Sequence, residues 1–458
     1  MKIITTISIL FLQMSVYAQM HVKHEPWQLE NANARIDSIR KGTTNLTFTL
    51  ANGKKLPSNA KLDLELQSHD FKFGVSMTQA RGFYGTDAFQ PYLDATKSLF
   101  NFATVGFYWY LTDERRNKKQ KQKINDALNT VIDWGVQNNI ALKGHPLLWH
   151  ESNPDWVVNM EDMVKMDALI NKKIPQLINS YPEIDYWDVY NEPVAPFKNH
   201  VKPNGVSRWV KFKGGIYPAM AYLYNYVEEI NSNKIYVNNH YNPSDPAFHE
   251  LNQQMTDNDI PYQAIGMQAH MQTFDGIFSE SELWELIESF SVYDKEIQFT
   301  ELSITSSPKF NNWKDHQVFL DKRDKANRKG EKLNLETSTE GESYQAAYLK
   351  DFYTLVFSHP KVGAITMWNL TDRNAWRGHA AGILRSDFSP KPAFDTLRKL
   401  IKETWSTKLD TNINPKKPFK FNGFYGNYKG ILTLKNGNVY PINFDHLKSQ
   451  KSIQIKID

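Results

Sequence analysis

Short apolar stretches alternate with longer amphipathic stretches through most of this chain. Segments in which apolar residues recur at helical spacing include 121–138, 163–178, 218–230, 279–289 and 343–359. Eight short apolar runs lie before, between and after these segments, at 71–77, 102–109, 141–148, 186–192, 234–239, 264–270, 297–303 and 363–369. Eight strand–helix units predict an α/β fold, a (β/α)8 TIM barrel, over residues 70–405.

The two ends of the chain carry a different pattern. Residues 46–50 and 61–66 alternate like strands around a turn, which predicts a small β-rich segment over residues 19–69. The run 412–418 is rich in Pro and Lys, so we expect a linker over residues 406–418. Residues 419–458 hold four glycines among alternating apolar positions, which predicts a small C-terminal β module. The polar stretch 306–340 predicts a loop insertion beside the strand ends.

The N-terminus has the composition of a secretory signal peptide. Lys2 precedes an apolar run at 3–16, and Val16-Tyr17-Ala18 resembles a cleavage site. We therefore expect a signal peptide over residues 1–18 and a secreted or periplasmic protein in a bacterium. The chain has no Cys, which excludes a disulfide framework and a lipoprotein anchor.

Composition narrows the range of partners. The net charge is only +4, and the basic clusters at 114–123 and 321–332 are interrupted by acids and amides, so solvated surfaces are favoured over nucleic-acid binding. The chain has 12 Trp, 22 Tyr and 26 Phe, an aromatic content suited to stacking on sugar rings as well as to core packing. We expect a monomer with a carbohydrate partner and no membrane anchor.

Polar and aromatic side chains gather at the predicted strand ends, which converge at one mouth of a barrel. Glu192 ends the fourth strand and Glu301 lies on the seventh, across the barrel from it. Two carboxylates facing each other across a cleft are what glycoside hydrolysis requires. The other candidate substrate-binding residues are His145, Trp149, Asn191, Tyr241, Gln268, His270, Trp368 and Trp376.

These strand ends resemble those of glycoside hydrolase family 10, the family of retaining β-1,4-xylanases. The matching motifs fall in the family's order and cover residues 70–405. They are Gly144-His145-Pro146-Leu147-Leu148-Trp149-His150, Trp187-Asp188-Val189-Tyr190-Asn191-Glu192, Gly266-Met267-Gln268-Ala269-His270, Thr300-Glu301-Leu302, Trp368-Asn369-Leu370-Thr371-Asp372 with Trp376, and Pro390-Lys391-Pro392-Ala393.

The resemblance implies a role for each matching residue. Glu192 would be the general acid/base and Glu301 the nucleophile, with their carboxyls about 5–5.5 Å apart and a mildly acidic pH optimum. Asn191 would bond the sugar 2-hydroxyl, and His270 would contact Glu301. Gln268 would support Glu192 or a nearby hydroxyl. His145 and Trp149 would line the reactive subsite, and Trp368 and Trp376 would form its aromatic walls. The family needs no cofactor and no metal.

Three departures from the family bear on specificity. The family has a Glu-Asn pair and a Lys after the second strand, where this chain has Gly106, Phe107 and Tyr110. We expect an apolar wall there and an altered preference for the sugar on the non-reducing side. Ser303 and His240 also stand where the family has Asp.

Three hypotheses follow from the sequence. The first is a secreted retaining β-glycanase acting on xylan or a xylan-like polysaccharide. The second is the same chemistry on a different or modified β-glycan or β-glycoside, suggested by the segment 106–110. The third is a carbohydrate-binding protein without turnover, suggested by Ser303 and His240. A metal site built on His145 and His150 is disfavoured because no third ligand has suitable spacing.

Overall fold

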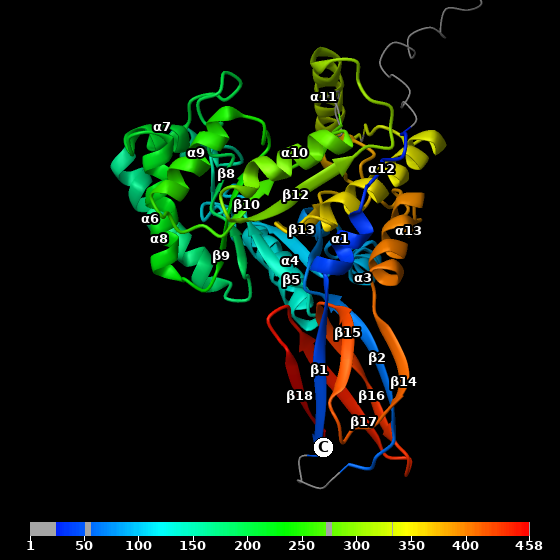
Figure 1. The fold of residues 1–458 in the computed structure, drawn as a ribbon. Coiled ribbons are helices and arrows are strands. Elements are labelled where there is room, and N and C mark those ends of the chain that lie inside the picture. The colour runs from blue at the N-terminus through cyan, green and yellow to red at the C-terminus, as the bar shows by residue number, and fades with distance from the viewer. Residues whose placement is uncertain (1–23, 51–55, 272–276, 332, 458) are drawn as a thin grey trace, which may run out of the picture.

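A computed structural model of the protein describes residues 24–50, 56–271, 277–331 and 333–457 (Figure 1). The expected signal peptide, residues 1–18, lies outside the described residues. Two parts are visible in Figure 1, a strand–helix barrel and a group of long strands below it. No helix in the described part of the chain is long and apolar enough to cross a membrane.

Eight parallel strands close into a barrel, which confirms the predicted (β/α)8 fold. The β13–β3 and β10–β12 pairings complete the circle. In order around the barrel the strands are β3 (Lys72–Ser76), β4 (Phe102–Gly106), β5 (Ala141–His145), β7 (Tyr186–Asp188), β9 (Ile235–His240), β10 (Ala264–Met267), β12 (Glu296–Ile304) and β13 (Val362–Met367). Each overlaps one of the eight predicted runs. The short strands β6 (Leu148–Trp149), β8 (Tyr190–Asn191) and β11 (His270–Met271) extend three of these strands toward the mouth.

The larger helices surround the barrel. They are α3 (Phe89–Leu99), α4 (Lys118–Gln137), α6 (Met163–Ser180), α8 (Ile216–Ile230), α9 (Pro246–Asp257), α10 (Glu280–Ser291) and α12 (Thr339–Phe357). The seven-residue helix α13 (Pro392–Arg398) packs beside α12. Several start where a polar side chain accepts a backbone N–H of the first turn, namely Asn117, Asp162, Ser279 and Ser338. Shorter helices are α1 (Ala32–Ile39), α2 (Ala80–Phe83), α5 (Asp155–Val158) and α7 (Gly205–Phe212), with helical turns η1 (Met77–Gln79), η2 (Trp376–Gly378) and η3 (Lys399–Thr404).

The insertion between β12 and β13 is not the loop that its polar sequence predicts. It contains the helix α11 (Trp313–Arg328), which begins at an Asn312 cap and stands out from the barrel in Figure 1. Among the residues of α11 only His316 is buried, so the sequence shows little apolar periodicity from which to predict a helix. His316 Nε2 lies 3.1 Å from His379 Nε2, which ties α11 to the segment that follows η2.

The strands from the two ends of the chain share two sheets, whereas the sequence suggested separate N-terminal and C-terminal units. In one sheet β1 (Lys41–Leu50) lies between β15 (Phe419–Phe424) and β18 (Ser452–Ile457). In the other, the order is β14 (Lys408–Ile413), β2 (Ala60–His69), β16 (Gly426–Leu434) and β17 (Val439–His446). Blue and orange-to-red strands therefore interleave in Figure 1. The expected linker at 406–418 contains β14, which pairs with β2 residue by residue.

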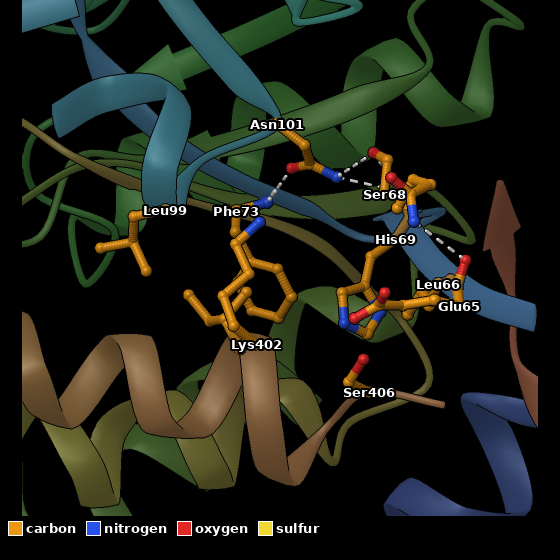
Figure 2. A pocket seen from close by; sticks show the side chains of 11 residues that line it. Glu65, Leu66, Ser68, His69, Phe73, Leu99, Asn101, Lys402 and Ser406 are labelled. Carbon is orange, nitrogen blue, oxygen red and sulfur yellow. Dashed lines mark hydrogen bonds between the residues drawn. The ribbon is translucent and has the colours of Figure 1, made fainter. Parts of the chain in front are cut away.

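The half-buried amide of Asn101 joins the strand β2 to the first barrel strand. Asn101 Oδ1 accepts from the backbone N–H of Phe73 at 2.8 Å, and its Nδ2 donates to Ser68 Oγ at 3.2 Å and to the carbonyl of His69 at 2.9 Å. Figure 2 shows this contact beside a small pocket of about 110 Å³ between the barrel and the strands below it. None of the candidate site residues lines this pocket, so it belongs to the seam between the two parts of the fold.

Candidate active site

Glu192 follows the short strand β8 at the mouth of the barrel. Its backbone adopts a positive φ of 60°, a strained conformation for a residue with a side chain. The backbone N–H donates to the carbonyl of Asn239 at 2.8 Å, which holds this turn against β9. Glu192 Oε1 accepts from Gln268 Nε2 at 3.0 Å, and its Oε2 accepts from Trp149 Nε1 at 3.3 Å. The register of β6 on β8, with Trp149 opposite Asn191, places the indole next to the carboxyl.

The surroundings of Glu192 favour its protonated form. Burial raises the pKa of the Glu192 carboxyl to about 8, and the charges of Glu151 and Glu301 also raise it, while the hydrogen bonds from Gln268 and Trp149 offset part of the effect. The carboxyl therefore carries a proton at neutral pH. A protonated carboxyl at the edge of a cleft can act as a general acid.

Glu301 lies in β12, where the register with β13 shifts between Phe299 and Leu302. Such a bulge turns a side chain out of the regular alternation and is common beside active sites. Glu301 Oε1 accepts from Asn239 Nδ2 at 2.9 Å, and its Oε2 lies 3.1 Å from His270 Nε2. The carboxyl is thus held by two donors inside the barrel mouth.

Glu301 stays ionised although it is only 4% exposed. Burial on its own would raise the pKa of this carboxyl, but the hydrogen bond from His270 and the charges of His145, His270 and Lys143 outweigh burial and lower the pKa below its ordinary value. The two glutamates therefore hold opposite protonation states at neutral pH. A pair of catalytic carboxyls needs one protonated group to act as the acid and one ionised group to act as the nucleophile.

Two side-chain amides connect the carboxyls. Asn239 Nδ2 donates both to Glu301 Oε1 and to Asn191 Oδ1, each at 2.9 Å. Asn191 Nδ2 in turn lies 3.4 Å from Glu192 Oε1. Thr300 Oγ1 donates to Asn239 Oδ1 at 2.6 Å and fixes the orientation of that amide. Asn239 was not among the candidate residues, although its position at the end of the fifth strand, in the row of polar strand ends, is a signal that could have identified it.

His270 rests on a hydroxyl where the family has a carboxylate. Its Nδ1 lies 3.1 Å from Ser303 Oγ, which also reaches the carbonyl of Glu301 at 3.2 Å. Nε2 must carry a proton to donate to the ionised Glu301. Ser303 can orient the imidazole, but it supplies no negative charge to it.

A buried ion pair supports His145 from below the mouth. Asp188 Oδ2 lies 2.7 Å from His145 Nδ1 and 3.0 Å from Lys143 Nζ. The pKa of the Asp188 carboxyl is lowered because the charge of Lys143 and the bond from His145 outweigh the effect of burial. Lys143 and Asp188 were not among the candidate residues, and each lies on a strand that the sequence predicts.

The candidate aromatic residues form a wall around His145 and His270. The ring of Trp368 contacts the imidazoles of His145 and His270, with centroids 5.6 and 5.8 Å apart, and that of Trp376 stacks on His270 at 4.5 Å. Tyr241 is half-buried beside His240, and the charge of Glu192 helps to raise the pKa of its phenol, after burial as the main cause. All ten candidate residues therefore lie at the same mouth.

The wall expected from Phe107 is absent. Phe107 is fully buried and packs on Tyr181 and Trp187, away from the mouth. Its neighbour Tyr108 faces the site instead, with its ring 5.5 Å from His145 and 6.1 Å from Trp149. The ring of Tyr110 stacks on that of Tyr108, with 6.0 Å between the ring centroids. Both residues follow the end of β4, where the chain leaves the regular strand, so strand position alone does not decide which ring faces the site.

His240 is a core residue. It is fully buried against Phe248 and Tyr241, and neither ring nitrogen has a hydrogen-bond partner among the described residues. Burial lowers the pKa of its imidazole to about 3, so it is neutral. The described residues contain no group of three or more His, Asp or Glu side chains that could hold a metal ion.

Solved structures of similar fold come from xylanases. Xylanase 10B of Thermotoga petrophila RKU-1, solved in complex with xylobiose, matches with a TM-score of 0.57 at 18% identity, over 73% of this chain and 95% of that chain. The structure of a GH10 protein from Paenibacillus barcinonensis matches with a TM-score of 0.56 at 17% identity, over 72% and 95% of the two chains. At these identities the likeness concerns the fold.

Sequence relatives include proteins of two kinds. The anti-sigma-I factor RsgI6 of Acetivibrio thermocellus is 24% identical over 93% of this chain, and the chain spans only 49% of that relative. Endo-1,4-beta-xylanase B of Paenibacillus barcinonensis is 22% identical over 67% of this chain and 83% of its own length. The profile of the family described as glycosyl hydrolase family 10 matches residues 65–400, which include the whole barrel and both glutamates. The chain belongs to glycosyl hydrolase family 10.

Proposed function

We propose that this protein is a secreted, retaining glycoside hydrolase that cleaves β-1,4-xylosidic bonds in xylan or a xylan-like polysaccharide. The observation that carries the proposal is the pairing of a protonated Glu192 with an ionised Glu301, joined through Asn191 and Asn239. A retaining mechanism needs one carboxyl of each kind on the two sides of the scissile bond.

In the first step, an ionised oxygen of Glu301 attacks the anomeric carbon. The bond from that carbon to the glycosidic oxygen breaks, and Glu192 gives its proton to the departing oxygen. The products of this step are a covalent glycosyl ester on Glu301, a shortened sugar chain and an ionised Glu192.

In the second step, Glu192 takes a proton from a water molecule, and the resulting hydroxide oxygen bonds to the anomeric carbon. The ester bond to Glu301 breaks, which regenerates the starting protonation states and retains the anomeric configuration. Formation of the ester removes the charge of Glu301, one of the causes that raise the pKa of Glu192. Loss of that charge makes Glu192 a better acceptor at the stage when it must act as a base.

The neighbouring residues position these groups. The two amides hold both carboxyls on one hydrogen-bonded chain, and in this proposal Asn191 also bonds the 2-hydroxyl of the reacting sugar. Gln268 orients Glu192 and His270 orients Glu301. The rings of Trp149, Trp368 and Trp376 supply apolar faces for the sugar.

The segment after β4 favours a second candidate, the same reaction on a modified or different β-glycan. The family's polar contacts are absent here, and Tyr108 and Tyr110 occupy the region with aromatic rings. A site that hydrogen-bonds sugar hydroxyls discriminates strongly among substrates, so replacing such contacts by aromatic rings changes which glycone is accepted.

Product analysis on a panel of substrates tests both candidates. The panel contains plain xylan, decorated xylans, mixed-linkage glucan and aryl β-glycosides, with Glu301→Ala as the blank. Short xylo-oligosaccharides released from plain xylan support the first candidate, and release from another member alone supports the second. If no substrate is cleaved by the protein but some bind, the third hypothesis, a carbohydrate-binding protein without turnover, replaces both.

Export and a monomeric state complete the proposal. The signal peptide proposed for residues 1–18 is supported by the Lys2 and apolar-run pattern alone. N-terminal sequencing of protein recovered outside the cytoplasm tests it, and a start at Gln19 is the expected result. Light scattering of the purified chain tests the monomer, and a mass of about twice 53.1 kDa contradicts it.

A further inference from the structure

Arg377 is a half-buried guanidinium beside the proposed general acid. It lies over the ring of Trp376, with 4.3 Å between the guanidinium carbon and the ring centroid. It makes no hydrogen bond and no ion pair with any residue that the structure describes. A guanidinium has five N–H donors, and leaving them unbonded in a shielded position is costly. A ligand that supplies acceptor oxygens removes that cost.

The backbone at Arg377 is held in an unusual conformation. Its φ is 55°, the left-handed region that a residue with a side chain seldom adopts. Such a conformation persists where the surroundings hold it, and it is common at binding sites. On one side Trp376 stacks on His270, and on the other His379 bonds to His316 of α11. Arg377 is therefore presented from a short segment anchored at both ends.

A second guanidinium reaches the same place from α11. A Cβ placed on Gly378 would lie 2.9 Å from Arg323 Nε, so the Arg323 side chain lies directly against the residue next to Arg377. Its one ion pair among the described residues is to the neighbouring Asp324, at 3.8 Å. The insertion between β12 and β13 thus brings a second cation to the edge of the cleft.

The acids close to Arg377 do not neutralise its charge. Burial lowers the pKa of Arg377, and the charges of Glu151 and Glu192 partly oppose this shift. Neither carboxyl forms an ion pair with Arg377. Glu192 is protonated at neutral pH, since burial raises its pKa to about 8, so its carboxyl carries little charge there. Glu151 is exposed to solvent, where its charge is screened. A positive charge beside the scissile bond remains.

We infer that Arg377 and Arg323 bind an anionic substituent of the glycan, a carboxylate or a sulfate ester, on a sugar that lies beside Glu192. Planar guanidinium groups bond both kinds of oxyanion through paired N–H donors, and Arg is better suited to this than Lys. The inference rests on the proposed function for the presence of a glycan in the cleft, and it specifies the substrate class as acidic.

The alternative interpretation is that Arg377 has only a structural role and holds the Trp376 ring in place. Arg35 offers a comparison, because its guanidinium lies over Trp284 at 4.5 Å while also bonding Ser358 Oγ at 2.9 Å and the carbonyl of Glu30. Its donors are used by the protein, as expected for a structural role. Arg377 has the same stacking without those bonds, which leaves its donors for a ligand.

Calorimetric binding with the catalytically blocked Glu301→Gln protein tests the inference. The probes are three xylo-oligosaccharides of one backbone length: unsubstituted, bearing a uronic acid, and bearing a sulfate ester. We expect at least one acidic probe to bind about ten-fold more tightly than the neutral one, with a preference that shrinks at high salt. The acidic probe that is preferred identifies the source of the oxyanion.

The variants Arg377→Gln and Arg323→Gln, each in the blocked protein, should remove most of this preference. Arg35→Gln is the matched control for loss of an Arg–Trp stack and should keep it. Melting temperatures show whether each variant is folded, and Arg323→Gln, on the exposed helix α11, keeps the test decisive if Arg377→Gln is unstable. Equal affinities for all probes, no binding of any probe, or a preference that survives both variants would overturn the inference.

Turnover is measured separately. Hydrolysis of the neutral chain by the unmodified protein reports on the proposed function. A protein that prefers the acidic probe in an Arg377-dependent way but cleaves none of them refutes the proposed function and leaves the anionic site standing.

Discussion

Asn239 Nδ2 lies 2.9 Å from Glu301 Oε1 and also 2.9 Å from Asn191 Oδ1, so one amide group bonds residues on both sides of the cleft. Asn191 continues the connection to Glu192. The relative position of the two carboxyls therefore depends on a residue that performs no chemistry itself. This arrangement sets the alignment on which a displacement reaction depends.

Substitution of Asn239 by Ala should lower kcat about ten- to a hundred-fold, which corresponds to about 1.5–3 kcal/mol for a hydrogen bond to a charged group. The loss follows because Glu301 keeps only His270 as a donor. Initial rates on the preferred substrate check it. Asn225→Ala, an exposed amide on α8, is the control and should leave the rate unchanged. A normal kcat in Asn239→Ala would show that the amide is dispensable.

The pH profile of kcat/KM should have two limbs set by the two glutamates. As pH rises through about 8, Glu192 loses the proton that it must donate, and the rate falls. As pH falls through the lowered pKa of Glu301, the nucleophile becomes protonated and the rate falls again. The high pKa of Glu192 extends activity from the mildly acidic optimum through neutral pH.

An activated aryl glycoside identifies the alkaline limb, because its leaving group needs no proton. With this substrate Glu192→Gln should lack that limb, whereas the unmodified protein on an oligosaccharide should show it. An alkaline limb that persists in Glu192→Gln assigns it to another group and contradicts the role of Glu192 as the acid.

Ser303→Ala should lower kcat several-fold and move the acidic limb to higher pH. Without the hydroxyl, the imidazole of His270 is held less firmly, and the bond that lowers the pKa of Glu301 is weakened. A full pH profile distinguishes this effect from a general loss of stability. Ser307→Ala removes a buried hydroxyl that bonds Thr305 rather than His270. The acidic limb of the pH profile of this control variant should therefore not move. An unshifted acidic limb in Ser303→Ala would contradict the inference that Ser303, through His270, lowers the pKa of Glu301.

Substitution of the adjacent residues Phe107 and Tyr108 by Ala should have different effects on stability and activity. Phe107→Ala should lower the free energy of unfolding by about 3–5 kcal/mol, because it leaves a cavity in the core beside Tyr181 and Trp187. Tyr108→Ala should cost less stability and instead reduce kcat/KM, since this ring faces His145 and Trp149. Denaturant titration and rates on the same samples check both. A stable Phe107→Ala protein with altered substrate preference would reverse the assignment.

Asn101→Ala should destabilise the seam between β2 and the barrel by about 1–3 kcal/mol, because it leaves the N–H of Phe73 and the carbonyl of His69 without their partner. Thermal melting is the measurement. Asn422→Ala on β15 removes an exposed hydrogen bond to Thr43 of β1 and should change stability by less than about 0.5 kcal/mol. Equal effects of the two substitutions would mean that the seam contributes little.

Much of the barrel and its two glutamates could be predicted because the sequence patterns that indicate them are local. A parallel strand buried on both faces needs a short apolar run, and the third to eighth runs here carry polar residues at the point where the strand ends. Parallel strands in a barrel place those ends together, so the positions of Glu192 and Glu301 in the chain were enough to bring them to one mouth.

The pairing of the terminal strands could not be read from the chain. The segment 41–50 alternates in the same way whatever its partner is, and the partners β15 and β18 come from the other end of the sequence. Period-two alternation gives a strand its inner and outer faces but does not specify its neighbours. The strand β14 was mistaken for part of a linker for the same reason, since only its pairing with β2 distinguishes it.

The sequence by itself determined the eight strands, the order of their polar ends and the family to which the barrel is similar. Only the tertiary structure decided the protonation states of the two glutamates, because these depend on burial and on His270, brought from another strand. It also decided that Tyr108 faces the site while Phe107 faces the core, and that Arg377 lies beside Glu192. The direction in which a side chain points and the electrostatic environment of a carboxyl depend on contacts between segments that are distant in the sequence. A local sequence pattern cannot predict such contacts.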